Sequence, residues 1–113
     1  MALSAKSKEL LGSASTATIQ TQLFIRGFRN QFLNGVILRT PSHKNFVGEA
    51  FTLRYIPARE DLDKVEAFKD PKHPQRFAVE SIGPGQVMVV DSRGDGRAAS
   101  AGEILITRIA KRG

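Results

Sequence analysis

The sequence lacks cysteine and tryptophan, and it has a single tyrosine among its 113 residues. The absence of cysteine excludes disulfides, thiolate nucleophiles and cysteine-bound zinc, and it is typical of proteins in the reducing cytoplasm. No apolar run approaches the roughly 18 residues that a membrane helix needs. Residues 1–11 also lack the apolar centre of a secretion signal. We therefore expect a cytoplasmic protein in which oxygen or histidine ligands hold any metal.

A strong excess of basic charge is present, but it is not gathered into one run. The 17 Lys and Arg residues exceed the 11 Asp and Glu residues, which gives a formal net charge of +6. Such a charge indicates either a nucleic-acid partner or a well-solvated surface. The basic residues are scattered singly or in pairs, and most of the seven Phe residues fall at positions that a core would take. We favour the solvated surface and expect no nucleic-acid partner.

The length and composition predict one folded domain over residues 1–113. In its first half, several Ser and Thr residues precede a helical apolar pattern at 13–26, and Gly27 is a helix stop. Asn34-Gly35 is a turn signal before the β-branched run 36–38, which predicts a buried strand. Alternation between residues 48 and 57 predicts a second strand with one buried face.

The second half predicts a loop, a helix, a strand and a helix. Residues 58–74 are densely charged and read as a long surface loop with one helical turn, a candidate lid. A helix is predicted at 74–82 and a strand at 86–91, which is apolar on both faces and typical of a central parallel strand. An amphipathic helix is predicted from about residue 99 to 112. The order is that of an α/β domain.

The predicted last helix would normally lead by a right-handed crossover to another parallel strand. The sequence ends at Gly113, immediately after that helix. We therefore expect that the domain is truncated before its last central strands. An unpaired central strand would also favour association with another chain.

The most informative segment is the loop that leads from the strand at 86–91 to the last helix. In open α/β sheets, ligands bind beyond the carboxyl ends of strands, where a helix start presents free backbone N–H groups. Gly102 would let a ligand carboxylate approach closely, the amides of residues 103–105 would donate to it, and Glu103 would position a metal-bound water or a hydroxyl. In the alternative interpretation the glycines only turn the chain, and Glu103 is a favourable charge in a first helical turn.

Other motifs in the sequence are weaker. Residues 94–99 match the pattern G-x-G-x-x-A, but they begin three residues after the predicted strand and no acidic partner follows at the distance a dinucleotide site needs. Asp91 and Asp95 are more typical of turns than of a calcium loop. His43 and His73 lie in predicted loops without the spacing of zinc ligands.

Four blocks of the sequence, in their order and spacing, resemble successive blocks of the RraA-like family. The resemblance covers nearly the whole chain from Leu10 onward. This family includes regulators of ribonuclease activity and metal-dependent 4-hydroxy-4-methyl-2-oxoglutarate aldolases. The blocks are Ser15-Thr16-Ala17-Thr18-Ile19, Gly48-Glu49-Ala50-Phe51-Thr52-Leu53, Gly85-Gln86-Val87-Met88-Val89-Val90-Asp91 and Ala101-Gly102-Glu103-Ile104-Leu105.

The resemblance implies a swivelling β/α domain that assembles as trimers or hexamers, with sites between subunits. The family's enzymes use a magnesium-class ion to stabilise the pyruvate enolate formed by retro-aldol cleavage or by oxaloacetate decarboxylation. The resemblance also implies a substrate loop whose amides hold the pyruvate carboxylate and whose acidic residue, Glu103, helps order the metal shell. That loop consists of Gly102, Glu103, Ile104 and Leu105.

One departure from the family leaves the activity open. Members continue after the equivalent of Gly113 into a strand and a Gly-x-x-Arg-Asp-like motif, whose arginine binds substrate and whose aspartate ligates the metal. This sequence lacks the motif, so the ligand of a divalent ion such as Mg²⁺ is expected downstream, and none of the 113 residues is assigned as a metal ligand.

Two hypotheses follow from the resemblance. The leading one is the amino-terminal part of an RraA-like aldolase or decarboxylase that acts on 4-hydroxy-4-methyl-2-oxoglutarate or oxaloacetate. The alternative is a non-catalytic regulator that binds and inhibits a ribonuclease. The expected partners are a small 2-oxo acid and either further copies of the chain or a completing second chain.

Overall fold

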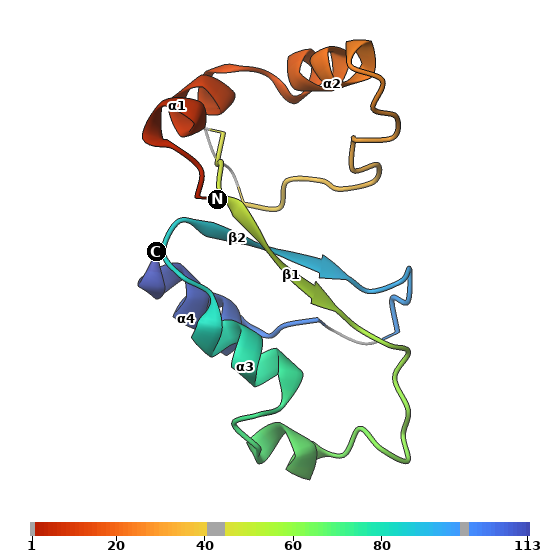
Figure 1. Ribbon diagram of the computed structural model, residues 1–113. Coiled ribbons are helices and arrows are strands. Elements are labelled where there is room, and N and C mark those ends of the chain that lie inside the picture. The colour runs from red at the N-terminus through yellow and green to blue at the C-terminus, as the bar shows by residue number, and fades with distance from the viewer. Residues whose placement is uncertain (1, 41–44, 98–99) are drawn as a thin grey trace. The chain divides into compact units, whose positions relative to one another are not determined.

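The computed structural model describes residues 2–40, 45–97 and 100–113. Helices and a pair of parallel strands make this an α/β protein, as predicted (Figure 1). The chain divides into two compact units, Met1–Gly48 and Glu49–Gly113, which are described separately. The single domain over residues 1–113 stays a prediction. The elements are α1 (Ala5–Ser13), α2 (Thr16–Ile25), β1 (Glu49–Arg54), the 3-10 helix η1 (Val65–Lys69), α3 (Pro74–Ser81), β2 (Gln86–Asp91) and α4 (Glu103–Arg112).

Both helices of the first unit begin at a serine cap. The Ser4 hydroxyl accepts from the Ser7 N–H, and the Ser15 hydroxyl accepts from the Thr18 N–H, each at 3.1 Å. Such caps satisfy backbone donors that have no partner inside the helix. The helix predicted at 13–26 is confirmed as α2, and it ends before Gly27, whose φ of 87° suits glycine. Helix α1 was not predicted.

The buried strand predicted at 36–38 is wrong. The turn at Asn34-Gly35 is present, with Gly35 at a φ of 77°, but residues 36–38 lie in a loop without regular secondary structure. Their side chains are exposed, at 72% for Val36 and 62% for Ile37. A strand needs a neighbour to receive its backbone hydrogen bonds. Within residues 2–40 and 45–48, no strand lies beside this segment.

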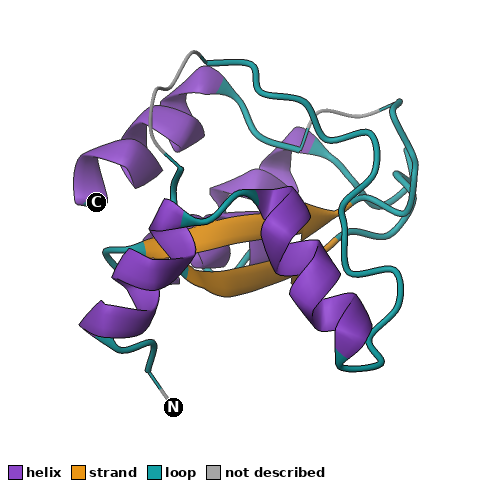
Figure 2. Ribbon diagram, turned by 90° about the horizontal axis from the view of Figure 1, so that it is seen from above, coloured by secondary structure: helices purple, strands orange, loops and turns teal. Residues whose placement is uncertain are grey.

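In the second unit, β1 and β2 pair in parallel, with Glu49 opposite Gln86 and Arg54 opposite Asp91 (Figure 2). Both strands lie where the sequence predicted them. The Tyr55 N–H extends the ladder by donating to the Asp91 carbonyl at 2.9 Å. Burial of β2 on both faces is not observed, because Val89 is 37% exposed while its sequence neighbours Met88 and Val90 are half-buried.

Helices α3 and α4 pack against each other on one side of the strand pair (Figure 1). The fully buried apolar side chains in the described parts of the chain come from α3 and its C-cap, namely Ala78, Val79 and Ile82. At the surface, the Glu80 carboxylate accepts from Arg108 and Arg112 of α4. The helix predicted at 74–82 is therefore confirmed, and it supplies the core of this unit.

Two further sequence predictions concern the surface loop and the last helix. The loop at 58–74 contains one short helix, η1, as expected. The last helix begins at Glu103 and not near residue 99, because Ala101 and Gly102 precede the first helical turn and Gly102 is extended. Residues 98 and 99 lie outside the described part of the chain. Across residues 2–40, 45–97 and 100–113, no helix has the length and hydropathy to span a bilayer.

Candidate functional site

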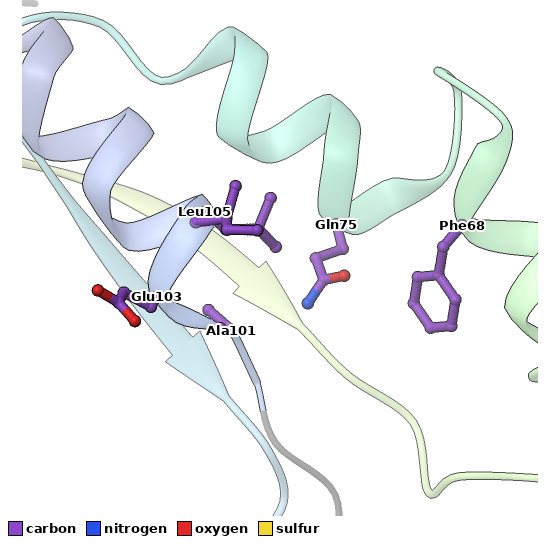
Figure 3. Close-up of a pocket in the computed structure, with 7 residues that line it drawn as sticks. Phe68, Gln75, Ala101, Glu103 and Leu105 are labelled. Carbon is purple, nitrogen blue, oxygen red and sulfur yellow. The ribbon is translucent and has the colours of Figure 1, made fainter.

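A pocket of about 660 Å³ lies at the start of α4 (Figure 3). It is near the carboxyl end of the parallel strands, since Tyr55 follows β1 directly and its hydroxyl reaches Ser100, two residues before Gly102. Ligands of open α/β sheets bind at this edge. The pocket is lined by Phe68, Gln75, Ala101, Gly102, Glu103, Ile104 and Leu105.

The first turn of α4 is open to a ligand. Its N-cap residue, Gly102, has φ −94° and ψ 171° and no side-chain cap, unlike the serine caps of α1 and α2. The first helical hydrogen bond runs from the Ile106 N–H to the Gly102 carbonyl, so the N–H groups of residues 103–105 come before it. A Cβ atom placed on Gly102 would meet nothing within 4 Å. The backbone does not require glycine at this position. Because glycine has no side chain, no cap covers the amides of the first turn.

Three residues from separate segments meet just before α4. The Ser100 carbonyl accepts from the Tyr55 hydroxyl at 2.8 Å and from Gln75 Nε2 at 2.6 Å. Gln75 is in the first turn of α3, where Pro74 starts the helix with a backbone angle suited to that position. Figure 3 shows Gln75 reaching toward the start of α4. Two side chains thus fix the chain that enters the pocket.

The Tyr55 hydroxyl is partly shielded from water at this point. Burial raises the pKa of Tyr55 above its ordinary value of 10.0, and a hydrogen bond with Gln75 offsets part of this rise. The hydroxyl therefore keeps its proton at neutral pH and remains a donor. The predicted apolar pattern of the strand placed Tyr55 in the core, so its polar role at the strand end was not foreseen.

Phe68 forms an apolar wall of the pocket. Its ring lies 4.6 Å from the His73 ring, centre to centre. Arg76 donates to the carbonyls of Phe68 and Lys69 at 3.2 and 3.1 Å, which holds the end of η1 against α3. The segment predicted as a candidate lid therefore reaches the pocket through this one residue. No sequence signal distinguished Phe68 from the other phenylalanines.

The aspartate that ends β2, Asp91, and the one in the following loop, Asp95, both bond to the chain nearby. Asp91 accepts from the Arg93 N–H and from Arg54, which lowers its pKa. Asp95 accepts from the side chain and the N–H of Arg97, and these bonds lower its pKa to about 2. Both contacts fit the expected turn role. Among the described residues, no three His, Asp or Glu side chains lie close enough to hold a metal ion.

The structure brings the four predicted site residues into one pocket lining, although their roles stay predictions. The Glu103 side chain is exposed, and in Figure 3 its carboxylate lies on the other side of Ala101 from Gln75 and Phe68. Glu103 therefore borders the pocket mainly through its backbone. His73 is at the N-cap of α3, and His43 lies outside the described residues.

Together, these features define an α/β protein with an uncapped helix start in a pocket at the carboxyl edge of parallel strands. Residues 10–113 match the model of the RraA-like family, described as Aldolase/RraA, and the chain belongs to that family. The resemblance seen in the sequence blocks is thus confirmed. No curated protein and no solved structure matches the chain.

Proposed function

We propose that this chain carries the carboxylate-binding part of a metal-dependent RraA-like aldolase or decarboxylase. Its proposed substrates are 2-oxo acids that yield pyruvate, such as 4-hydroxy-4-methyl-2-oxoglutarate and oxaloacetate. Membership of the Aldolase/RraA family supports this reaction class. The observation that carries the proposal is the uncapped first turn of α4, whose amides open into the pocket.

The backbone amides of residues 103–105 are proposed to bind the substrate carboxylate. A helix start combines free N–H donors with the positive end of the helix dipole, and both favour an anion. Leu105 and Phe68 supply apolar surface on the walls of the pocket, beside the amides. The chain contributes orientation and charge stabilisation of the carboxylate end of the substrate.

The proposed cofactor is a divalent cation, Mg²⁺ by the family's chemistry. Bound Mg²⁺ acts as a Lewis acid that stabilises an enolate. The described residues do not supply a complete ligand set, since no cluster of three candidate ligands is found among them. Mg²⁺ commonly keeps several waters and uses only one or two carboxylates. From the family's chemistry we propose that Glu103 orders the metal's water shell, which requires its exposed side chain to turn toward the pocket, and we place the direct ligand outside the described residues.

The first experiment measures pyruvate binding to the 113-residue chain, together with pyruvate release from both substrates with Mg²⁺ after subtraction of the metal-only rate. Pyruvate binding is expected, whereas turnover above background would contradict the expectation that the family's Arg-Asp motif is needed. Gly102→Asp should abolish binding, because the new carboxylate caps the amides and repels the pyruvate carboxylate, whereas the matched control Gly102→Ala adds only a methyl group in open space. Unchanged binding in Gly102→Asp, or no binding by the natural sequence, contradicts the proposal.

An alternative function is inhibition of a ribonuclease by protein contact. The exposed apolar side chains of the second unit favour this reading, since Ile56, Val65 and Ile104 are each more than 70% exposed. Burial of such side chains against a protein partner would favour association. A ribonuclease assay with the added chain separates the two functions. If the chain is a regulator, the natural sequence and Gly102→Asp should inhibit the nuclease equally well.

A further inference from the structure

We propose that Tyr55 and Gln75 are positioning residues that aim the amides of α4 into the pocket by holding the Ser100 carbonyl. This inference rests on the proposed carboxylate site and names two residues to which no sequence pattern assigned a function. Neither residue is proposed to carry out chemistry. Each acts through the backbone that precedes Gly102.

The geometry ties the entry of α4 to two other elements. The Ser100 carbonyl receives both hydrogen bonds, one from the chain just after β1 and one from the first turn of α3. Tyr55 is itself fixed, because its N–H donates to the Asp91 carbonyl. The direction of the Ser100 carbonyl is thus set by the strand pair and by α3. Two residues later the chain reaches Gly102, where the open amides begin.

The other end of α4 is held by different contacts. Arg108 and Arg112 pair with Glu80, and the Gly85 N–H donates to the Gly113 carbonyl. Loss of the bonds to Ser100 therefore leaves α4 attached to α3 while releasing its first turn. A role in positioning predicts a local change at residues 103–105, whereas a general role in stability predicts a change spread over the whole unit.

The chain offers a matched control for this distinction. Gln75 donates to a backbone carbonyl at 2.6 Å, and Gln86 accepts from the Gly83 N–H at 2.7 Å in the same unit. Both bonds are partly buried and join a glutamine side chain to the backbone. Gln75→Leu and Gln86→Leu should therefore reduce overall stability to a similar extent. Gln75 lines the pocket, whereas Gln86 is not among its lining residues.

The sequence also supplies an internal reporter. Tyr55 is the one tyrosine, and the sequence has no tryptophan. Intrinsic tyrosine emission of the protein therefore comes from Tyr55 alone. Because its hydroxyl bonds the segment that enters the pocket, pyruvate binding at the α4 amides should change this emission. Gln75→Leu should change the emission intensity of the free protein, and Gln86→Leu should leave it unchanged.

The test compares the natural sequence with Tyr55→Phe, Gln75→Leu and Gln86→Leu by amide NMR, with pyruvate as the probe. In the free protein, Tyr55→Phe and Gln75→Leu should move the amide signals of residues 103–105 and speed their hydrogen exchange. They should weaken pyruvate binding about three- to tenfold, the range expected when one hydrogen bond is lost. Gln86→Leu should do neither. In the double variant the two effects should not add, because both side chains act on one carbonyl.

Two outcomes would overturn the inference. One is that the signals of residues 103–105 do not move in Tyr55→Phe and Gln75→Leu. The other is that Gln86→Leu changes these signals and pyruvate affinity as much as Gln75→Leu does. If the natural sequence binds no pyruvate, the proposed function fails, but the amide signals of the free protein still decide whether Tyr55 and Gln75 position the start of α4.

Discussion

At the scale of single residues, the helices differ in the residue at their N-cap: serine in α1 and α2, and glycine in α4. Ser4 and Ser15 close the starts of α1 and α2 with side-chain hydrogen bonds. Gly102 leaves the start of α4 open, although a side chain there would meet no steric obstacle. A serine or aspartate at Gly102 would stabilise the helix by capping it. The absence of a cap therefore keeps donors available at the expense of local stability.

A prediction at this scale concerns the pH dependence of stability. Burial raises the pKa of Tyr55 in the folded chain above 10.0, so the unfolded chain loses its proton first as the pH rises. The contribution of Tyr55 is thus fully present below pH 10.0 and is lost as the pH rises through the folded-state pKa. The near-ultraviolet absorbance of tyrosinate follows this one residue directly, and urea unfolding at increasing pH reports the stability.

Tyr55→Phe is the control for this pH dependence. The variant should lower the free energy of unfolding at neutral pH by roughly 1 kcal/mol, the typical net value of one hydrogen bond. Its free energy of unfolding should also fall less steeply at alkaline pH than that of the natural sequence. Some decline should remain, because the remaining basic residues still titrate. A natural sequence whose tyrosinate appears below pH 10.0 would contradict the burial of the hydroxyl.

At the scale of elements, sequence patterns correctly predicted the strands and helices whose signals lie within a few neighbouring residues. The strand at 86–91 and the helix at 74–82 were found from a run of apolar residues, a proline at the helix start and the glycines that follow. The run at 36–38 has the same β-branched character but no partner strand among the described residues. Pairing is a non-local property, so the pattern alone could not separate the two cases.

The candidate site divides in the same way. The presence of α4 and the segment 102–105 before and within its first turn were foreseen from local signals, a glycine and an amphipathic pattern, although the helix was predicted to begin about four residues too early. Tyr55, Phe68 and Gln75 were missed because they come from three segments that meet only in the fold. An alternating strand pattern marks Tyr55 as apolar, and nothing in it reveals a hydrogen bond to Ser100, 45 residues away. Spatial convergence, and not residue type, defines these parts of the site.

A prediction at this scale tests the ion pairs between α3 and α4. Glu80 accepts from Arg108 and Arg112, and the hydrogen bond with Arg108 is the main cause that lowers its pKa. This contribution to stability is present above the ordinary pKa of the carboxyl and is lost as the pH falls through the lowered value. Glu80→Gln should lower the melting temperature slightly at neutral pH and hardly at all in acid, as surface pairs contribute little.

The same variant should leave pyruvate binding unchanged, because the first turn of α4 is held by Tyr55 and Gln75 at its other end. The control is Glu66→Gln, which removes an exposed carboxylate from η1 without touching α4. Weaker pyruvate binding in Glu80→Gln but not in Glu66→Gln would show that the ion pairs, too, orient the start of the helix.

At the scale of the whole chain, little apolar surface is removed from water. The fully buried apolar residues in the described ranges are three, whereas many large apolar side chains are exposed in each unit. Burial of apolar area is the dominant favourable contribution to folding and association. We therefore propose that the chain works as a homo-oligomer, a trimer or hexamer, or together with a completing second chain.

The oligomer proposal predicts a mass in solution well above the 12.4 kDa of one chain. Ile106 on α4 is 56% exposed and does not line the pocket, so it is available to a neighbouring copy. Ile106→Lys should shift the sedimentation profile toward the monomer, because a buried charge opposes association. Thr107→Lys adds the same charge at the next exposed position and should have a smaller effect. A natural sequence that sediments as a monomer at all concentrations would refute self-association, and equal effects of the two variants would exclude Ile106 from the contact.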